Sequence, residues 1–447
     1  MNIEPKFPIE KWDSKEKYEK AGIVGYEPMT AKELDTEEAQ DRELNNSDNY
    51  IEEKFDGTRA LVHFFSQPYI ENGEVVGGEG WCRVFSRRIS KKTGFYVENS
   101  DSVPQIRDID CYNLGGTVLD GEMFIPDKGF QISSAIMNCK YDEAIRRQEE
   151  NGYQVFHAFD ILFFKGIDLR DKPLRVRKMY LRIAVAEANS PYIQCVKYYS
   201  CGKELPNSVY ELLYDRVTEY DIEQWEEELD SNKYPNLYSL YKSGGNPKLT
   251  PRSYYELIVS TGGEGVIVKP KEGKYLHKRG WEYSKIKSFL TRELILIGFD
   301  KPTREYTGKA PKDWEYYEGD TPVTKYYARK QVGNMILGVL ISMKDYKSIP
   351  EHKRGTLLHL DPFVCKKNGI PYSKDMYIMT VCECSGYTEE EREYFTKHKK
   401  ELIFSVVEVK ANGLMKDSGK LRHPRFLRLR PDKGAYACDW VNHLGGI

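Results

Sequence analysis

Short apolar runs separated by turn-forming residues dominate the chain from Tyr50 onward. Runs of this length that are rich in Val, Ile, Leu and Phe predict β-strands. The predicted strands before Phe289 cover residues 59–66, 81–86, 117–124 and 154–162. Apolar residues at helical spacing predict helices instead. The predicted helices cover residues 142–150, 173–188 and 254–260.

The chain changes character after Phe289, where β-forming residues become more frequent. The predicted strands of this part cover residues 333–343, 376–382 and 403–410. Several short strands in a terminal block of this length predict a small β-barrel. We therefore expect an α+β protein with two domains, residues 1–288 and residues 289–447.

Two segments interrupt this pattern. A strongly acidic helical stretch at 208–230 lies within a longer segment near 205–245. We expect this segment to be an insertion that is exposed to solvent. Residues 302–323 are expected to form a loop, because they are rich in Pro, Gly and charged residues.

The composition is that of an ordinary soluble protein, with 30% charged and 40% hydrophobic residues. No run of about 18 apolar residues occurs, and the charged N-terminus lacks the apolar stretch of a signal peptide. A cytoplasmic location is therefore the expectation. The nine cysteines are scattered, and the closest pair, Cys382 and Cys384, has no second pair to complete a zinc site. We expect these cysteines to be reduced and buried by packing.

The net charge of −2 conceals a basic stretch near the C-terminus. Residues 416–433 hold seven Lys or Arg against two Asp, and Leu, Phe and Pro lie between them. A charged run is usually a solvated surface, but this interleaving favours a strand or loop that lines a groove.

Lys54 lies in the sequence Glu52-Glu-Lys-Phe-Asp-Gly-Thr-Arg59, at the expected start of a strand. One interpretation is a surface β-turn with Asp-Gly at its corner. The other is a nucleophilic lysine, which must lose its proton before it can attack phosphorus. Desolvation and a nearby cation, such as Arg59 or a metal ion, lower the pKa of such an amine.

The later segments supply further groups of the same chemistry. Glu122 ends an apolar strand, Phe159 lies beside a carboxylate, and Glu264 lies on a glycine turn before a buried strand. Lys285 and Lys287 alternate along one strand face. Each has a structural interpretation: a strand end, a core aromatic residue, a turn or a solvated face. Together they suit transfer of a nucleotidyl group, with a nucleophile, cations for phosphates, acids for Mg²⁺ and an aromatic ring for a base.

With these segments in this order, the chain resembles the covalent nucleotidyltransferases, which comprise ATP-dependent DNA ligases, RNA ligases and mRNA capping enzymes. The matching segments are Lys54–Arg59, Ser86-Arg87, Asp120-Gly-Glu122, Phe159-Asp160, Glu264–Lys269, Lys285-Ile-Lys287 and Arg430-Pro-Asp-Lys433. The resemblance spans residues 50–433 and implies an adenylation domain of antiparallel sheets with flanking helices, followed by an OB-fold β-barrel.

Residues 159–178 and 413–433 resemble DNA ligases in particular, and the four-cysteine zinc site of NAD-dependent ligases is missing. ATP is therefore the implied donor, Mg²⁺ the implied metal, and nicked double-stranded DNA the implied partner of a monomeric enzyme. Only 53 residues precede Lys54, which resembles the compact ligases encoded by phages. Two alternatives are an ATP-dependent RNA ligase and a non-catalytic nucleic-acid binding module. The loop at 302–323, with its cations and aromatic residues, is either plain surface or a segment that closes over DNA.

The resemblance implies that Lys54 forms a phosphoramidate with AMP. It implies that Glu52 reads the adenine and that Phe159 stacks on it. Arg59 and Arg87 are the implied contacts to phosphate.

The remaining implied roles concern metal and phosphate. Glu122 binds ribose or assists metal binding, and Glu264 coordinates Mg²⁺. Lys285 and Lys287 neutralise the α-phosphate. Arg430 and Lys433 orient the outgoing pyrophosphate from the second domain.

Overall fold

The computed structural model describes residues 12–443 except 21, 127, 129, 218, 307–313, 368–369, 371–372 and 414–419. The chain divides into two compact units, Met1–Lys287 and Ser288–Ile447. This division falls within one residue of the boundary placed at 288 and 289 from the sequence. Each unit is described by itself.

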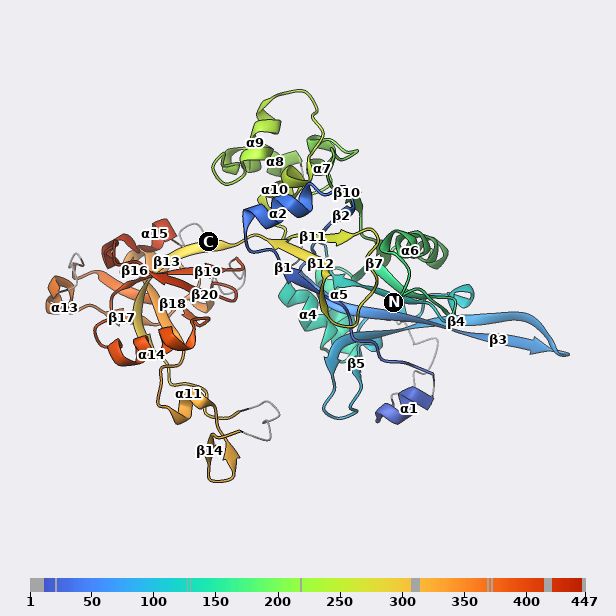
Figure 1. Ribbon diagram of the computed structural model, residues 1–447, viewed down its shortest axis with the longest axis horizontal. Helices are drawn as coiled ribbons and strands as arrows, with labels where there is room; N and C mark the ends of the chain where they lie inside the picture. The colour runs from blue at the N-terminus through green and yellow to red at the C-terminus, as the bar shows by residue number, and fades with distance from the viewer. Residues whose placement is uncertain are drawn as a thin grey trace. The chain divides into compact units, whose positions relative to one another are not determined.

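The first unit contains a seven-stranded sheet with a long hairpin (Figure 1). The strand order is β5 (Tyr96–Glu98), β4 (Glu74–Ile89), β3 (Thr58–Glu71), β6 (Val118–Phe124), β7 (Val155–Phe164) and β8 (Ile167–Asp168), with β9 (Ile193–Cys195) paired to β7. Four helices lie beside this seven-stranded sheet: α3 (Pro104–Arg107), α4 (Phe130–Met137), α5 (Tyr141–Asn151) and α6 (Leu174–Ala188). Helix α6 packs against β7 and β9.

The hairpin is longer than the sequence pattern predicts. The first strand was expected to end at residue 66 and the second to begin at residue 81. In the structure both strands continue into the glycine-rich residues between them and meet at a turn at Asn72-Gly73. Both turn residues have positive φ, +53° and +86°. Asn-Gly is the preferred pair for the two-residue turn whose twist matches the twist of the flanking strands. The turn chemistry therefore extends the pairing beyond the apolar runs.

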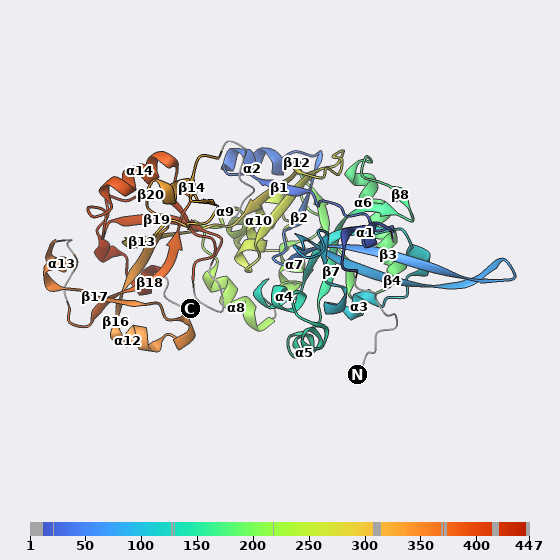
Figure 2. The same cartoon turned by 90° about the horizontal axis from the view of Figure 1, so that it is seen from below.

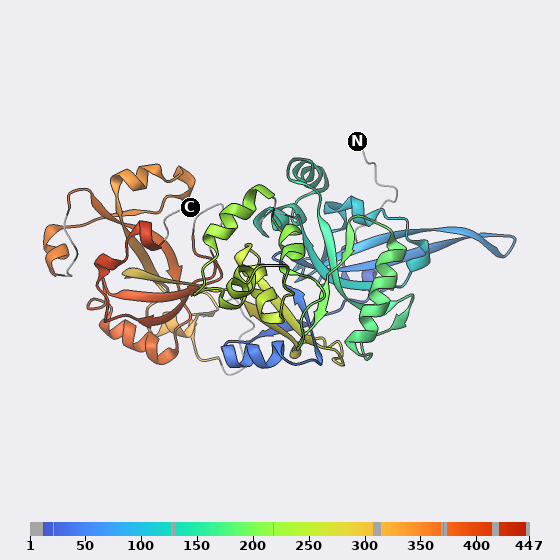
Figure 3. The same ribbon diagram turned by 90° about the horizontal axis from the view of Figure 1, so that it is seen from above.

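A second sheet of the first unit has the order β1 (Thr30–Glu33), β12 (Arg279–Lys287), β11 (Gly265–Pro270), β2 (Asn49–Glu53) and β10 (Tyr198–Ser200). Its neighbours are antiparallel except for β1 and β12. One face carries a layer of helices, which Figure 2 and Figure 3 show from opposite sides. These helices are α2 (Glu37–Leu44), α7 (Val209–Tyr214), α8 (Glu219–Glu228), α9 (Pro235–Lys242) and α10 (Pro251–Ser260), and α1 (Lys15–Lys20) lies at the N-terminal end of the described chain.

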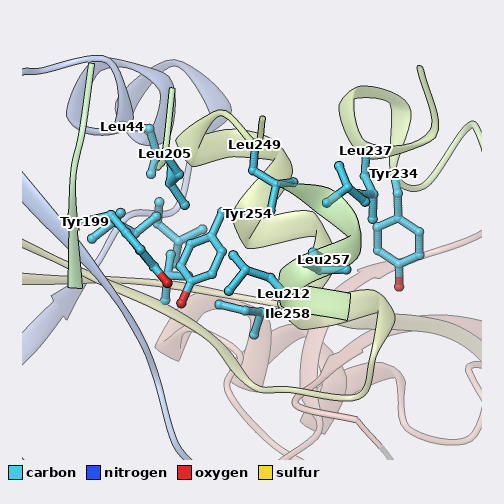
Figure 4. Packing of buried hydrophobic residues seen from close by; sticks show 14 of the residues in the cluster. Leu44, Tyr199, Leu205, Leu212, Tyr234, Leu237, Leu249, Tyr254, Leu257 and Ile258 are labelled. Atoms are coloured by element: carbon cyan, nitrogen blue, oxygen red, sulfur yellow. The ribbon is translucent and has the colours of Figure 1, made fainter. Parts of the chain in front are cut away.

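The acidic segment belongs to this helical layer, so the expectation of a solvent-exposed insertion is wrong. Trp225 and Leu229 of this segment are buried, together with Leu237 and Tyr241 of α9. They belong to one apolar cluster with Leu257 of α10. Figure 4 shows Leu237, Leu257 and other residues of this cluster. Trp225 of α8 and Leu229, directly after this helix, are four residues apart, which suits burial on one side. Asp221, Glu223 and Glu226–Glu228 of α8 are exposed.

The second unit contains a six-stranded antiparallel sheet. Its order is β17 (Leu357–His359), β18 (Met376–Cys384), β16 (Met335–Ser342), β13 (Leu290–Phe299), β19 (Val406–Ala411) and β20 (Arg425–Leu429). A parallel bridge between Ser385 and Arg425 links the end of β18 to the start of β20, so the sheet curls toward closure. The described strands do not complete a closed barrel. A partly open barrel is characteristic of the OB-fold, and the expected α+β class is confirmed.

The remaining elements of the second unit surround this sheet. They are β14 (Tyr317–Glu318), β15 (Thr321–Pro322), α11 (Lys325–Ala328), α12 (Met343–Ser348), α13 (Pro362–Lys367), α14 (Glu389–His398) and α15 (Trp440–His443). The expected loop at 302–323 contains the small β14–β15 hairpin, and its Lys309 and Lys312 lie outside the described residues. The basic stretch is described from Lys420 onward and includes β20. Seven of the nine cysteines are buried, as expected, whereas Cys139 and Cys195 are partly exposed.

Candidate active site

Lys54, Glu264 and Lys287 lie together at the end of β2, the start of β11 and the end of β12. Strand β11 lies between β2 and β12, and its first residue, Gly265, pairs with Lys287. The carbonyl oxygen of Gly265 accepts a hydrogen bond of 2.9 Å from the backbone nitrogen of Lys54, directly after β2. The carboxylate that precedes β11 therefore lies between the two lysines. One oxygen of Glu264 pairs with Lys54 Nζ and the other with Lys287 Nζ.

The electrostatics of this group follow from partial burial of paired charges. The side chains of Lys54, Glu264 and Lys287 are 23%, 12% and 12% exposed. Burial raises the pKa of Glu264, but Lys54 and Lys287 outweigh it, so the net pKa lies below its usual range. Burial lowers the pKa of Lys287, against the attraction of Glu264. Glu264 is therefore a carboxylate at neutral pH, with both its oxygens occupied by ammonium groups.

Arg59 is fixed on the seven-stranded sheet by a buried carboxylate. Its Nε and Nη2 donate to the two oxygens of Asp120 at 2.5 and 2.6 Å, and Nη2 also donates to the carbonyl of Met29 at 3.1 Å. The hydroxyl of Tyr275 donates to the same carboxylate at 2.6 Å. A bidentate pair of this kind holds a guanidinium in one orientation. Arg59 is thus held in place before any ligand binds.

Phe159 lies close to two cations. Arg59 Cζ and Lys269 Nζ each lie 4.4 Å from the centre of its ring. The next residue, Asp160, is fully buried and binds Arg177 through two hydrogen bonds of 2.8 and 2.9 Å. This buried pair fixes the backbone that carries Phe159. The ring is partly exposed, as an aromatic platform for a base requires.

Glu52 is buried, and its two oxygens face two buried ammonium groups. Lys178 lies 2.5 Å from one oxygen and Lys269 donates to the other at 2.7 Å. Burial lowers the pKa of Lys269 to about 8, although Glu52 opposes this shift. The carboxylate is thus engaged within the protein, and its contact with adenine stays a prediction.

Glu122 pairs across the sheet with Arg59 on one side and with His157 on the other. Burial raises the pKa of Glu122 to about 7, and the cations of Lys54 and Arg59 oppose the rise. Beside it, Phe55 and His157 lie with their ring centres 4.7 and 4.2 Å from that of Phe124. The stack ties the residue after Lys54 to the seven-stranded sheet.

The other predicted site residues are distributed as follows. Lys285 is on β12, one pleat from Lys287, and its ammonium lies 3.1 Å from Glu33. Arg87 is exposed on β4. Arg430 and Lys433 belong to the second unit, where both bind Glu293. Their place relative to Lys54 stays a prediction.

Several residues that build the site were not predicted from the sequence. Asp120, Lys178 and Lys269 each belong to a matching segment or its flank, yet no role was assigned to their side chains. Their partners are distant in the sequence. Lys269 and its partner Glu52, for example, are 217 residues apart. The available signal was the presence of a charged residue within an otherwise apolar strand or helix, because a buried charge requires a partner.

Two glycines of the matching segments are required by close backbone contact. A Cβ at Gly265 would lie 2.1 Å from the carbonyl oxygen of Ile286, and this residue has φ +140°. A Cβ at Gly57 would lie 2.5 Å from the carbonyl oxygen of Met123. Both glycines therefore allow the segments that carry Glu264 and Lys54 to approach their neighbouring strands.

No group of three or more His, Cys, Asp or Glu side chains is placed to hold a metal ion in the part of the chain that the structure describes. Glu122 and Glu264 are the two carboxylates beside Lys54 in that part. Nor does any described helix have the length and apolar character to cross a membrane.

Comparison with known proteins gives a family match within the first unit. Residues 28–217 match the ATP dependent DNA ligase domain. The DNA ligase of Halorubrum lacusprofundi is 33% identical over 150 residues, which is 31% of this chain and 23% of that protein. The DNA ligase of Archaeoglobus fulgidus is 23% identical over 428 residues, 94% of this chain and 58% of that protein. The chain thus spans less than two thirds of the length of these relatives.

A solved structure from a structure–function study of Lig E DNA ligases aligns with 91% of this chain and all of its own, at 15% identity and a TM-score of 0.48. The family match covers Lys54, directly after β2, and the strands that carry Arg59, Glu122 and Phe159. Residues 28–217 of the chain are thus similar to the ATP dependent DNA ligase domain.

Proposed function

We propose that this protein is an ATP-dependent DNA ligase that seals a 5′-phosphate to a 3′-hydroxyl at nicks, through AMP bound covalently to Lys54. The observation that carries the proposal is the ion pair of Lys54 with Glu264, close enough to Glu122 for Lys54 and Arg59 both to lower the pKa of that carboxyl. Arg59 in turn lies over the ring of Phe159. An ammonium, a guanidinium, two carboxylates and a partly exposed ring are the groups that bind and attack a nucleoside triphosphate.

Three displacements at phosphorus make up the proposed reaction. Lys54 Nζ loses a proton and attacks the α-phosphate of ATP, so that an N–P bond forms and pyrophosphate leaves. An oxygen of the 5′-phosphate at the nick then attacks the AMP phosphorus, and the N–P bond breaks. Finally the 3′-hydroxyl loses its proton, attacks the 5′-phosphorus and displaces AMP. Each step needs alignment of the attacking and leaving groups and cations around the phosphate.

The described residues fit ATP and Mg²⁺. Mg²⁺ is commonly bound by one or two carboxylates together with substrate phosphates and water. Glu264 and Glu122 provide two carboxylates beside Lys54, which suits an ion that arrives with the triphosphate. Bound there, Mg²⁺ would neutralise phosphate charge. Glu264 and Glu122 are the side chains that would hold the ion.

The second unit has a supporting role in this proposal. Arg430 and Lys433 would orient the pyrophosphate, as the family resemblance implies. Their present partner, Glu293, is an acid of the same unit, and phosphate would replace it. The proposed partner is nicked double-stranded DNA and the proposed working form is a cytoplasmic monomer. Sedimentation with and without nicked DNA measures that stoichiometry.

Labelling and sealing assays test the proposal directly. The protein is incubated with Mg²⁺ and α-labelled ATP and then supplied with nicked DNA or nicked RNA. The proposal requires a labelled protein whose label moves to the 5′-phosphate of DNA before the nick is sealed. An unlabelled protein would overturn the adenylation chemistry. Sealing of RNA but not DNA would make the enzyme an RNA ligase instead.

Replacement of Phe159 by alanine is expected to weaken ATP binding. Stacking of a base on an aromatic ring contributes about 1–3 kcal/mol, so the KM for ATP should rise by about tenfold or more. Adenylation kinetics over a range of ATP concentrations measure the change, and Phe159→Tyr should retain wild-type KM. Phe164→Ala, at the far end of the same strand, is the matched control. An unchanged KM in Phe159→Ala would remove the ring from the binding site.

The pH dependence of adenylation is expected to report Glu122. Its pKa of about 7 means that the ligand-free protein carries a neutral carboxyl below pH 7 and a carboxylate above it. If the carboxylate binds ribose or metal, kcat/KM for ATP should rise about tenfold from pH 6 to pH 8 on account of this group. Glu122→Gln should remove that inflection.

The same shift predicts a change in stability. A carboxyl whose pKa is raised on folding stabilises the protein below its unfolded pKa, and this contribution is lost as pH rises through about 7. Glu122→Gln should therefore be the more stable protein at pH 8, as urea unfolding measures. A Glu122→Gln protein that keeps the inflection in kcat/KM near pH 7, or that is no more stable than wild type at pH 8, would contradict this account of Glu122.

The basic stretch is expected to contact DNA phosphates. Each phosphate contact adds about 0.9 to the slope of log affinity against log salt concentration. Replacement of Arg425, which is exposed on β20, by alanine should therefore reduce that slope by about one. Binding to nicked DNA at several salt concentrations measures it, with Lys347→Ala on α12 as the control. An unchanged slope in Arg425→Ala would give this stretch a structural role only.

A further inference from the structure

The strand that precedes Lys54 has a second face, turned away from the reacting groups. Glu52 lies on the face that carries Lys178 and Lys269, whereas Ile51 and Glu53 point to the opposite face. Ile51 is fully buried in the apolar cluster of the helical layer. Glu53 is thus a charged side chain at the edge of this layer. Its partner comes from the acidic segment.

Arg216 reaches Glu53 from the turn after α7. Its Nη1 donates to Glu53 Oε2 at 2.6 Å, and its Nε donates to Thr261 Oγ1 at 2.6 Å. A Cβ at Gly263 would lie 2.9 Å from Nη2 of the same guanidinium. The side chains of Arg216 and Glu53 are 19% and 18% exposed. The guanidinium therefore lies against two segments at once, the end of β2 and the turn after α10.

These contacts involve the chain neighbours of both members of the reacting pair. Glu53 directly precedes Lys54, and Gly263 directly precedes Glu264. We propose that Arg216 is a positioning residue, which aligns Lys54 with Glu264 from the back of the sheet. The planar guanidinium holds its hydrogen-bond partners at fixed spacing. A displacement of about 1 Å in a reacting group can slow a reaction by about a hundredfold.

Arg216 is itself fixed by the helical layer. Its backbone nitrogen donates to the carbonyl of Leu213 at 2.9 Å, and Leu213 is fully buried. Helix α7 begins with a capping box between Ser208 and Glu211, which fixes its first turn. The segment near 205–245 therefore has a task beyond packing. It delivers a cation to the back of the strand that carries Lys54.

The inference rests on the proposed function and is tested by single-turnover kinetics on the full chain. Arg216→Met removes the charge and keeps much of the side-chain volume, and Arg216→Lys retains the charge. Asp215→Asn is the matched control, because Asp215 is the neighbouring residue and forms an exposed pair with Lys197. Two rates are measured with each variant: adenylation by ATP, and sealing of a nick that already carries 5′-AMP.

Arg216→Met is expected to slow adenylation at saturating ATP by about tenfold to a hundredfold. Sealing of the pre-adenylated nick should stay within about twofold of wild type, because Lys54 does not react in that step. Arg216→Lys should recover part of the adenylation rate, and Asp215→Asn should match wild type. Adenylation within about twofold of wild type in Arg216→Met, or equal loss of both rates, would overturn the inference.

A double-mutant cycle with Glu53→Ala tests the route of the effect. If Arg216 acts through Glu53, the double variant should adenylate no more slowly than Arg216→Met alone. Additive losses would contradict that route. Glu53→Ala by itself provides an independent variant should Arg216→Met not fold, since it removes the carboxylate that the guanidinium binds. It should likewise slow adenylation more than sealing.

The proposed function and this inference fail in different ways. A wild-type protein that is not labelled by ATP removes the proposed function. A wild-type protein that is labelled normally, with Arg216 variants that are labelled equally fast, removes only the positioning role.

Discussion

Replacement of Lys54 by alanine is expected to abolish covalent labelling by ATP and ATP-dependent sealing of nicks. Loss of a covalent nucleophile typically slows an enzyme by many orders of magnitude, and we expect at least about a ten-thousandfold loss here. Lys54→Arg should be equally inactive, because a guanidinium stays protonated in proteins and has no free electron pair for attack. Gel analysis after incubation with α-labelled ATP measures the label.

The Lys54→Ala protein should still seal a nick that already carries 5′-AMP, because that step forms no bond to the lysine. The side chain of Lys54 is partly exposed, so its removal should leave the fold intact. Lys197→Ala, which removes a largely exposed lysine, is the control for nonspecific loss of charge. A labelled Lys54→Ala protein would place the covalent bond elsewhere.

The ion pairs of Glu264 engage both of its oxygens. Lys54 pairs with one oxygen and Lys287 with the other. Both lysines lower the pKa of this carboxyl, against the effect of burial. A cation that binds either oxygen therefore competes with a lysine of the same protein.

The sequence pattern predicted much of the first unit because its signals are local. The helices at 142–150 and 173–188 correspond to α5 and α6, whose apolar spacing reports one buried face. The helix at 254–260 begins earlier, at Pro251, because Thr250 caps it and proline suits a first turn. The elements that carry several of the candidate site residues were therefore predicted, whereas the roles of those residues stay predictions.

The parts that could not be predicted depend on contacts between distant residues. Lys54 and Glu264 are 210 residues apart, and the motif order says only that they act together. Their contact follows from the position of β11 between β2 and β12, which no local pattern encodes. Glu52 was assigned to adenine, but its burial against Lys178 and Lys269 depends on that same strand order.

The prediction for the acidic segment was wrong for another reason. Its charges dominate the composition and conceal two apolar residues at helical spacing, Trp225 and Leu229. The indole nitrogen of Trp225 donates to Ser260 of α10 at 3.1 Å, which fixes α8 against the helical layer. A count of charges predicts a solvated surface, whereas the spacing of the few apolar residues determines the buried face.

Replacement of Asp160 by asparagine is expected to destabilise the protein by about 3–5 kcal/mol, since it leaves a buried cation without its counter-ion. Asp160 and Arg177 are both almost fully buried, and their pair is bidentate. Two carbonyl groups, those of Lys172 and Gly273, accept from the same guanidinium but carry no charge to balance it. Urea unfolding at pH 7 measures the difference.

An exposed pair of the same chemistry supplies the control. Asp168 and Arg170 also form two side-chain hydrogen bonds, at 2.9 and 2.6 Å, but their side chains are 47% and 30% exposed. Asp168→Asn should therefore change the free energy of unfolding by less than about 1 kcal/mol. Equal losses in Asp160→Asn and Asp168→Asn would contradict the role of burial.

The pH dependence of this difference follows from the pKa of Asp160. Burial alone would raise that pKa, but the attraction of Arg177 outweighs it and lowers the value to about 2. A carboxyl whose pKa is depressed on folding contributes its stability above the unfolded value of about 4, and this contribution is lost as pH falls through about 2. The gap between wild type and Asp160→Asn should therefore be constant at neutral pH and narrow below pH 4. A gap that stays constant there would assign the loss to packing, because the buried charge pair is the part of the interaction that titrates.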